Sequence, residues 1–404
     1  MTQFSFVLLC YNNWNMTKQA ITSLLESLDP IHQSKGIELI IVDNGSTDET
    51  QEGIQQVKEE YENNLIKIEN IQLNQNMGYT PGINSGLSKC QGNIISILNN
   101  DLVFPDKWFN GLVEVLESDE KIGLVAPYLS KSSGLQNVMK QFSSVDEMKT
   151  FAAQFMKEKE KCITFTHRVI GACMVFKREV IELIGGNDIW FGLGQFDDDD
   201  WCIRTIIAGY KIAVVGKSFV HHITSVTYNQ QSQVVKASYL INKAKLRRKW
   251  RMKKKTPLEA MLETEIYLKE KHYFPIKMED FNPLPFPNFN KSEERRKFLL
   301  IADWTHPFSK WKEKLLSAIQ DMNENDEIHL WVPNLYYKRF DILEEISTDI
   351  NPSSLSKIKL NYDTICPSDY LIFLNSFNVI YSVEDDYVNR YMVSIASSIS
   401  IPAY

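Results

Sequence analysis

The sequence contains no uninterrupted apolar run of about 18 residues, which is the length that a membrane-spanning helix needs. Its first segment, MTQFSFVLLCYNN, lacks a basic stretch and a small-residue cleavage site, so we expect a first buried strand and not a secretory signal. Cysteine is scarce: the six cysteines are scattered, without a C-x-x-C pair or a metal-ligand spacing. This pattern is typical of reduced core residues and predicts a cytoplasmic protein.

The sequence also has no excess of basic residues. The formal net charge of -7 is mild, and it argues against nucleic acid as a partner. The composition is otherwise that of a soluble globular protein, with 44% hydrophobic and 24% charged residues. A chain of 404 residues is long enough for two or three domains.

Composition shifts divide the chain into three regions. We expect an N-terminal domain over residues 1–231, a basic helical segment with a Pro-rich linker over 232–296, and a smaller α/β domain over 297–404. In the last region the pattern predicts strands at 297–304, 327–333 and 371–374, with helices at 310–322 and 339–347.

The first hundred residues alternate between short apolar runs and helical patterns. We expect strands at 4–11, 36–44, 64–73 and 92–101, separated by helices at 17–28, 46–61 and 80–90. Ser46 and Glu49 match a capping box, and Thr80 followed by Pro81 suits an N-cap. This alternation predicts an α/β fold with a mostly parallel, doubly wound sheet.

Polar clusters follow each of these four strands. They are Tyr11-Asn12, residues 43–46, residues 74–78, and Asn99-Asn100-Asp101. Each cluster alone is also what an ordinary turn contains. In a doubly wound sheet, however, ligands bind at the carboxyl ends of the strands, so the four clusters together predict a binding site.

Six segments in a fixed order carry a family resemblance. They are VDNGSTDET, NQNMGYTPGINSGL, ISILNND, GACMVFKRE, FGLGQFDDDDWCIRTIIAGYKI and VHHITSVTY, with KLRRKW as a looser match. Together they resemble the family two inverting glycosyltransferases of GT-A fold, of the type that serves bacterial polysaccharide or protein glycosylation. The resemblance implies a GT-A domain in the N-terminal region, and a nucleotide-sugar site made of Tyr11, Asn12, Asp43, Asn76, Gly78, Asn99, Asn100 and Asp101.

Within that site the resemblance makes Asp43 a contact to the base or ribose. Asn99-Asn100-Asp101 occupies the place of the family's D-x-D motif, so Asp101 is expected to hold Mn2+ or Mg2+ at the diphosphate. An amide stands where the strict motif has its first acid, and Asn99 is expected at the ribose or at a metal-bound water. His221-His222 offers a further ligand, and because neighbours in a strand face opposite ways we favour one of them, His221.

The run QFDDDDWCIR is the most acidic point of the chain. The resemblance lays the family's E-D-x-D pattern onto residues 197–200, which makes Asp198 the general base, with Asp197 as the alternative register. We expect Asp200 and Arg204 to be structural, since they are one helical turn apart. The competing interpretation of the run is a solvated helix N-terminus.

Two neighbouring segments have open interpretations. Trp190 and Phe191 lie in a Gly-rich loop that is either a stacking platform for the acceptor or a packed hinge. The basic stretch at 242–255 is a helix face in contact with the domain, a clamp over the diphosphate, or an anchor on anionic lipid.

These features predict an inverting glycosyltransferase that uses a nucleotide-sugar donor, with UDP- or dTDP-sugars favoured. The acceptor is a hydroxyl of a glycan, a lipid-linked molecule or a protein. We expect the enzyme in the cytoplasm, including the inner face of the membrane, and keep a homo-oligomer open. Two alternatives are a sugar-nucleotide nucleotidyltransferase and a catalytically degenerate protein that binds carbohydrate or acts as a scaffold.

Overall fold

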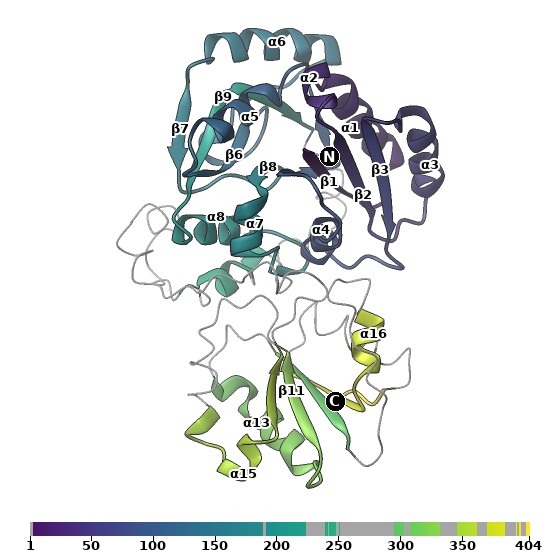
Figure 1. Cartoon of the computed structure of the whole chain (residues 1–404), viewed down its shortest axis with the longest axis vertical. Coiled ribbons are helices and arrows are strands. Elements are labelled where there is room, and N and C mark those ends of the chain that lie inside the picture. Colours follow the sequence, from purple (N-terminus) through teal and green to yellow (C-terminus); the bar gives the residue numbers. More distant parts are fainter. Residues whose placement is uncertain are drawn as a thin grey trace.

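The structure is a computed structural model of the chain. It describes residues 3–188, 191–223, 239–240, 242–247, 250, 295–302, 308–331, 346–361, 370–383, 393, 396 and 401–404. Within these residues the chain forms a large mixed sheet in the N-terminal region and a small parallel sheet near the C-terminus (Figure 1). The predicted α/β fold class is therefore confirmed.

The larger sheet has nine strands in the order β3-β2-β1-β4-β8-β6-β9-β5, with β7 paired to β9. Four parallel strands form one half: β1 (Phe4–Cys10), β2 (Ile37–Asp43), β3 (Ile66–Gln72) and β4 (Ile94–Asn99). The other half contains β5 (Leu102–Val103), β6 (Ile122–Leu129), β7 (Ile163–Thr166), β8 (Cys173–Lys177) and β9 (Lys211–His222). β8 runs antiparallel between β4 and β6, so the sheet is mostly but not wholly parallel.

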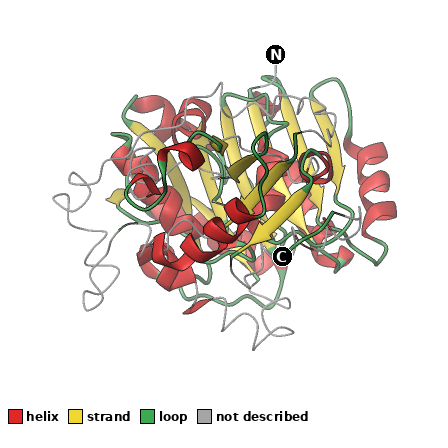
Figure 2. Cartoon of the chain, turned by 90° about the horizontal axis from the view of Figure 1, so that it is seen from below, coloured by secondary structure: helices red, strands yellow, loops and turns green. Residues whose placement is uncertain are grey.

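Helices cover both faces of this sheet because its central strands are apolar on both sides (Figure 2). In β1, Val7 and Leu9 pack into one hydrophobic cluster, whereas Phe6 and Leu8 pack into the other. The first cluster includes residues of α4 (Tyr79–Leu87), α7 (Arg178–Ile184) and α8 (Asp197–Ile207). The second includes residues of α1 (Trp14–Ser27), α3 (Thr50–Tyr61) and α5 (Asn110–Ser118).

Two predicted helix starts are wrong. The helix expected from Ser46 begins only at Thr50, and Glu49 makes no side-chain cap. Ser46 Oγ instead accepts a hydrogen bond from the Asn12 N–H at 2.8 Å, so a contact between two loops replaces the local capping box. The next helix, α4, begins at Tyr79 after Gly78, whose φ of 90° suits glycine alone.

The smaller sheet is parallel, with the order β12-β11-β10-β13. Its elements are β10 (Lys297–Ile301), α13 (Phe308–Gln320), β11 (Glu327–Trp331), α15 (Pro352–Leu355), β12 (Ile358–Asn361), α16 (Tyr370–Asn375) and β13 (Val379–Ser382). The strand predicted at 371–374 is wrong, because these residues lie in α16 and the strand follows at β13. Periodicity does not distinguish a short buried strand from a short buried helix.

The remaining elements are α2 (Pro30–Gln33), the short 3-10 helix η1 (Gly134–Gln136) and α6 (Val145–Glu158). Most of the helix predicted at 339–347 lies outside the described residues. Within the described part of the chain, none of the helices has the length and apolar character required to cross a membrane.

Candidate active site at the carboxyl edge of the larger sheet

The parallel register brings the predicted polar clusters to one edge. Cys10 at the end of β1 pairs with Asp43 at the end of β2, and Leu9 pairs with Asn99 at the end of β4. Asp43 and Asn99 therefore flank the end of β1 on its two sides, and Tyr11, which is half-buried, follows between them. The edge on which these side chains gather is the one that the sequence predicted.

Asp43 is completely buried at this edge. Its Oδ1 accepts a hydrogen bond from the Ser46 N–H at 2.9 Å. Its Oδ2 has no hydrogen-bond partner among the described residues. A buried carboxylate oxygen without a partner is costly, so this atom is well suited to accept a hydrogen bond from a ligand.

Three other residues that were predicted to contact the nucleotide form hydrogen bonds within and between the loops. Asn12 has a left-handed φ of 52°, and its Oδ1 accepts a hydrogen bond from the Thr47 N–H at 2.8 Å. Asn76 Oδ1 accepts from the Gly78 N–H at 2.9 Å and from Asn44 Nδ2 at 3.1 Å. Asn12, Asn76 and Gly78 thus shape the loops that surround Asp43.

The Asn99-Asn100-Asp101 segment separates its three side chains. Asn99 Oδ1 accepts a hydrogen bond from the Tyr79 hydroxyl at 3.3 Å, and Asn100 Nδ2 donates to Thr17 Oγ1 at 2.9 Å. Asp101 Oδ2 lies 3.2 Å from His222 Nε2, while Asp101 Oδ1 is buried without a hydrogen-bond partner in the described residues. Of the three residues, Asp101 is the one with a buried oxygen that accepts no hydrogen bond from the described residues.

The histidine beside Asp101 is His222, and not the favoured His221. β5 and β9 pair antiparallel with Leu102 opposite His222, which brings the His222 ring to Asp101. The His221 ring lies with its Nδ1 2.7 Å from Ser130 Oγ and packs edge-on against Phe142. Alternation along the strand predicted that the two histidines diverge, but only the register with β5 decides which one meets Asp101.

The contacts of His222 are compatible with either a proton or a metal ion between its ring and Asp101. Its Nδ1–H donates to the Lys131 carbonyl at 2.9 Å, which leaves Nε2 as the lone-pair nitrogen of the neutral ring. Burial lowers the pKa of His222, but the hydrogen bond and charge of Asp101 outweigh it and raise this pKa above its ordinary value. Two acceptors at 3.2 Å need a proton or a cation between them, and Asp101 Oδ1 could provide another ligand atom.

Two protein side chains do not complete a metal site. Among the described residues there is no group of three or more His, Cys, Asp or Glu side chains placed to hold a metal ion. Mn2+ or Mg2+ bound by Asp101 and His222 would therefore need oxygen ligands from water or from a bound phosphate group.

The four acidic residues form the first turn of α8, and the fold gives each a different environment. Asp199 lies 2.6 Å from Arg168 Nε, a partner that no spacing in the sequence indicated. Asp200 forms the predicted pair with Arg204 at 2.9 Å, and both side chains are 0% exposed. Asp200 also accepts a hydrogen bond from Trp250 Nε1 at 2.8 Å.

Asp198 and Asp197, the two candidates for the general base, also lie in different environments. Asp198 is half-buried, and its Oδ2 accepts a hydrogen bond from the Gly171 N–H at 2.9 Å. Asp197 is buried, and this burial, together with the charge of Asp198, raises the pKa of Asp197 well above its ordinary value. Asp198, which is half-buried and held by the Gly171 N–H, is therefore the more accessible of the two carboxylates and the favoured base.

Phe191, one of the two residues of the Gly-rich loop predicted to contact the acceptor, is packed inside the protein. Phe191 is only 2% exposed and packs with Phe196, Leu246 and Trp250, so its ring face is not open to a sugar. Asn242 Nδ2 donates to the carbonyls of Phe191 and Gly194 at 2.8 and 2.7 Å. Trp190 lies outside the described residues, as does most of the basic stretch beyond residue 247.

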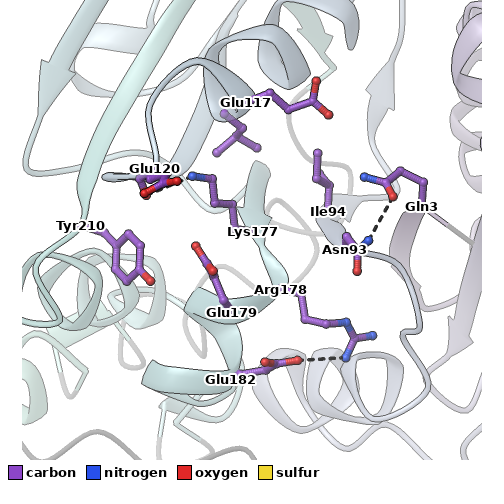
Figure 3. Close-up of a pocket in the computed structure, with 11 residues that line it drawn as sticks. Gln3, Asn93, Ile94, Glu117, Glu120, Lys177, Arg178, Glu179, Glu182 and Tyr210 are labelled. Carbon is purple, nitrogen blue, oxygen red and sulfur yellow. Dashed lines mark hydrogen bonds and ion pairs between the residues drawn. The ribbon is translucent and has the colours of Figure 1, made fainter.

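A cavity at the opposite edge of the sheet has a different character (Figure 3). It has a volume of about 820 Å³ and lies at the amino end of β4, around Asn93 and Ile94. Lys177 Nζ donates to the carbonyls of Asp119 and Glu120, both at 3.0 Å, and Arg178 lies 3.5 Å from Glu182. The basic side chains of the cavity, Lys177 and Arg178, are thus already paired. None of the predicted site residues lines the cavity.

Comparisons with known proteins find similarity to glycosyltransferases. Residues 5–185 match the model of "Glycosyl transferase family 2". The chain is 23% identical over 214 residues to "Probable glycosyltransferase YdaM" of Bacillus subtilis (strain 168), covering 52% of this chain and 48% of that protein. It is 29% identical over 115 residues to "Undecaprenyl-phosphate 4-deoxy-4-formamido-L-arabinose transferase" of Pseudomonas savastanoi pv. phaseolicola (strain 1448A / Race 6), covering 28% and 32%.

The chain thus spans about half the length of the first relative and about a third of the second. Among solved structures it is similar to mannosyltransferase PcManGT from Pyrobaculum calidifontis in complex with GDP-Man and Mn2+. The sequence identity is 19% and the TM-score is 0.47, over 66% of this chain and 69% of that chain. The family match ends at residue 185, before the acidic turn and the two histidines, so it does not assign their roles.

Proposed function

We propose, from the match of residues 5–185 to the family 2 glycosyltransferase model, that this protein transfers a sugar from a nucleotide-sugar donor to an acceptor hydroxyl. One observation carries the proposal. Asp43 and Asp101 each keep a buried oxygen without a hydrogen-bond partner in the described residues, at the edge of the sheet where Tyr79 links Asn99 to the residue that holds Asp198. This edge of the sheet thus provides a hydrogen-bond acceptor for a nucleoside, a position for a cation, and a carboxylate that can act as the general base.

The donor side consists of Asp43, Asp101 and His222. Asp43 Oδ2 would accept a hydrogen bond from the base or ribose, with Tyr11 beside it. Asp101 and His222 would hold Mn2+ or Mg2+, which supplies positive charge for the departing diphosphate. A UDP- or dTDP-linked sugar is our favoured donor, because a carboxylate at the position of Asp43 can accept from the N–H edge of a uracil-like base.

Asp198 would act on the acceptor side. As the acceptor oxygen attacks the anomeric carbon opposite the leaving diphosphate, Asp198 takes the hydroxyl proton, and the configuration at that carbon inverts. The Gly171 N–H donates to its Oδ2, and the neighbouring Asp197 is buried, with a pKa that this burial raises above its ordinary value. The acceptor classes are a glycan, a lipid-linked molecule and a protein.

The experiment is donor turnover with Mn2+ across a panel of sugar nucleotides. The wild type should release nucleoside diphosphate from one of them, and Asp198→Asn should reduce kcat about 100- to 10,000-fold. A chain that neither turns over nor binds any member of the panel is not a glycosyltransferase. Pyrophosphate release from a nucleoside triphosphate and a sugar phosphate would instead identify the nucleotidyltransferase alternative, and sugar-nucleotide binding without turnover the degenerate one.

A further inference from the structure

Tyr79 lies between the two halves of the candidate site. It is the first residue of α4, and its half-buried ring packs beside Gly194, where an added Cβ would stand 3.3 Å from Tyr79 Cβ. Its hydroxyl lies 3.3 Å from Asn99 Oδ1 and 3.4 Å from the Gly171 carbonyl oxygen. The hydroxyl proton therefore has one acceptor on the donor side of the site and one on the acceptor side.

Gly171 continues this connection to the proposed base. Its carbonyl faces the Tyr79 hydroxyl, and its N–H donates to Asp198 Oδ2 at 2.9 Å. A Cβ at residue 171 would lie 3.1 Å from Asp198 Cβ, a tight contact, so a glycine allows the backbone to approach the carboxylate closely. These contacts connect Asn99 through Tyr79 and Gly171 to Asp198, with the single hydroxyl proton of Tyr79 shared between the oxygens of Asn99 and Gly171.

The charges around Tyr79 keep its hydroxyl protonated. Burial, followed by the negative charges of Asp197, Asp198 and Asp101, raises the pKa of Tyr79 well above its ordinary value. A neutral phenol keeps its proton and remains a hydrogen-bond donor throughout the physiological pH range. Phenylalanine at this position would keep the ring and remove only the donor.

We propose that Tyr79 is a positioning residue of the glycosyl transfer described above: its hydroxyl ties Asn99, beside the cation position, to Gly171, which orients Asp198. The inference rests on the proposed function. Without the hydroxyl, Asn99 and the Gly171 peptide lose their common partner, and the carboxylate of Asp198 is held less firmly toward the acceptor. Donor binding depends on Asp43, Asp101 and His222, and it should persist.

The test compares Tyr79→Phe with Tyr210→Phe. Tyr210 is the matched control because it is also half-buried and bonded to a carboxylate, Glu179, but lies at the opposite edge of the sheet. Tyr79→Phe should lower kcat about 10- to 100-fold, since small errors in catalytic geometry have effects of this size. Its donor KM and thermal midpoint should match those of the control, whose kcat should equal that of the wild type.

A double-mutant cycle separates positioning from a general structural role. In an Asp198→Asn background, Tyr79→Phe should reduce the remaining kcat less than twofold, because residues that act as one unit are not additive. Equal kcat in Tyr79→Phe and Tyr210→Phe overturns the inference, and so does a full additional loss in the double variant. An inactive wild type contradicts the proposed function itself, whereas an active wild type with an unaffected Tyr79→Phe contradicts only the inference.

Discussion

At the carboxyl edge of the larger sheet, Asp43 and Asp101 each keep a buried oxygen without a hydrogen-bond partner in the described residues. At the amino edge the charged groups satisfy one another: Lys211 lies 3.0 Å from Asp119, and Arg178 lies 3.5 Å from Glu182. The cavity of about 820 Å³ belongs to the amino edge, where Figure 3 shows the two basic side chains of β8 and α7 next to acidic ones. The proposed site therefore rests on the oxygens of Asp43 and Asp101, and not on the volume of a cavity.

The direction of the chain accounts for this difference. In the parallel part of the sheet, helices begin near the carboxyl ends of strands and end near the amino ends. The carboxyl edge therefore presents backbone N–H groups, as Ser46 does to Asp43, and these favour anions. The amino edge presents carbonyl groups that follow the end of α5, and Lys177 binds two of them.

The largest expected effect concerns the ion pair of Asp200 and Arg204, in which both side chains are wholly buried. Arg204→Met removes the guanidinium that pairs with the buried Asp200 carboxylate, so the free energy of unfolding should fall by about 3–5 kcal/mol. Lys211→Met removes the exposed pair with Asp119 at the other edge and should leave the unfolding midpoint unchanged. Chemical denaturation measures both, and equal destabilisation of the two variants would contradict the distinction between the edges.

An intermediate effect is expected on donor binding. Asp101→Ala removes the carboxylate proposed to hold the cation and should weaken Mn2+-dependent binding of the donor about 100-fold, as metal-ligand losses commonly do. Asp119→Ala removes a carboxylate of the amino edge and should not change the affinity. Titration calorimetry with and without Mn2+ provides the comparison. Unchanged affinity in Asp101→Ala would remove Asp101 from the proposed cation site.

The smallest effect is a pH dependence of opposite sign at the two edges. Burial and the charge of Asp198 raise the pKa of folded Asp197, so above the unfolded value of about 4 the unfolded chain loses this proton first. Stability therefore falls as the pH rises toward the raised pKa, and Asp197→Asn should stabilise the protein at pH 7 by about 1 kcal/mol.

Asp119 has the opposite linkage. The Lys121 N–H and Lys211 lower the pKa of folded Asp119, so its stabilisation is present above pH 4 and is lost as the pH falls through the lowered value. Asp119→Asn should thus reduce stability at pH 7, although by a small amount for so exposed a group. Thermal unfolding between pH 3.5 and 8 with a chelator present tests both signs. Destabilisation of Asp197→Asn at neutral pH would show that the charged form of Asp197 is the favoured one.

Local patterns predicted the four parallel strands β1 to β4 of the larger sheet, and the apolar runs of β1, β2 and β4 are almost wholly buried. They failed where a distant contact replaced a local one, as at Ser46, whose hydroxyl accepts from Asn12 and does not cap the helix. They also failed in the smaller sheet, where the apolar run at 371–374 fits a helix and a strand equally well.

In the candidate site, too, local spacing predicted some contacts and missed others. The i, i+4 spacing alone identified the pair of Asp200 and Arg204, because one helical turn connects them whatever the rest of the fold does. Nothing in the spacing indicated Arg168 as the partner of Asp199, since 31 residues separate them in the chain. Likewise Phe191 could be recognised as aromatic, but only the packing of Phe196 and Trp250 shows that its ring is buried.

The sequence by itself determined the alternation of strands and helices, the edge of the sheet where polar groups gather, and the residue types available for a nucleotide, a cation and a base. These follow from burial and from periodicity, which are local properties of the chain. Only the tertiary structure decided that His222 and not His221 meets Asp101, that Asp197 is the buried acid, and that Tyr79 reaches both Asn99 and Gly171. Those choices depend on strand register and on contacts between distant segments, which no local pattern encodes.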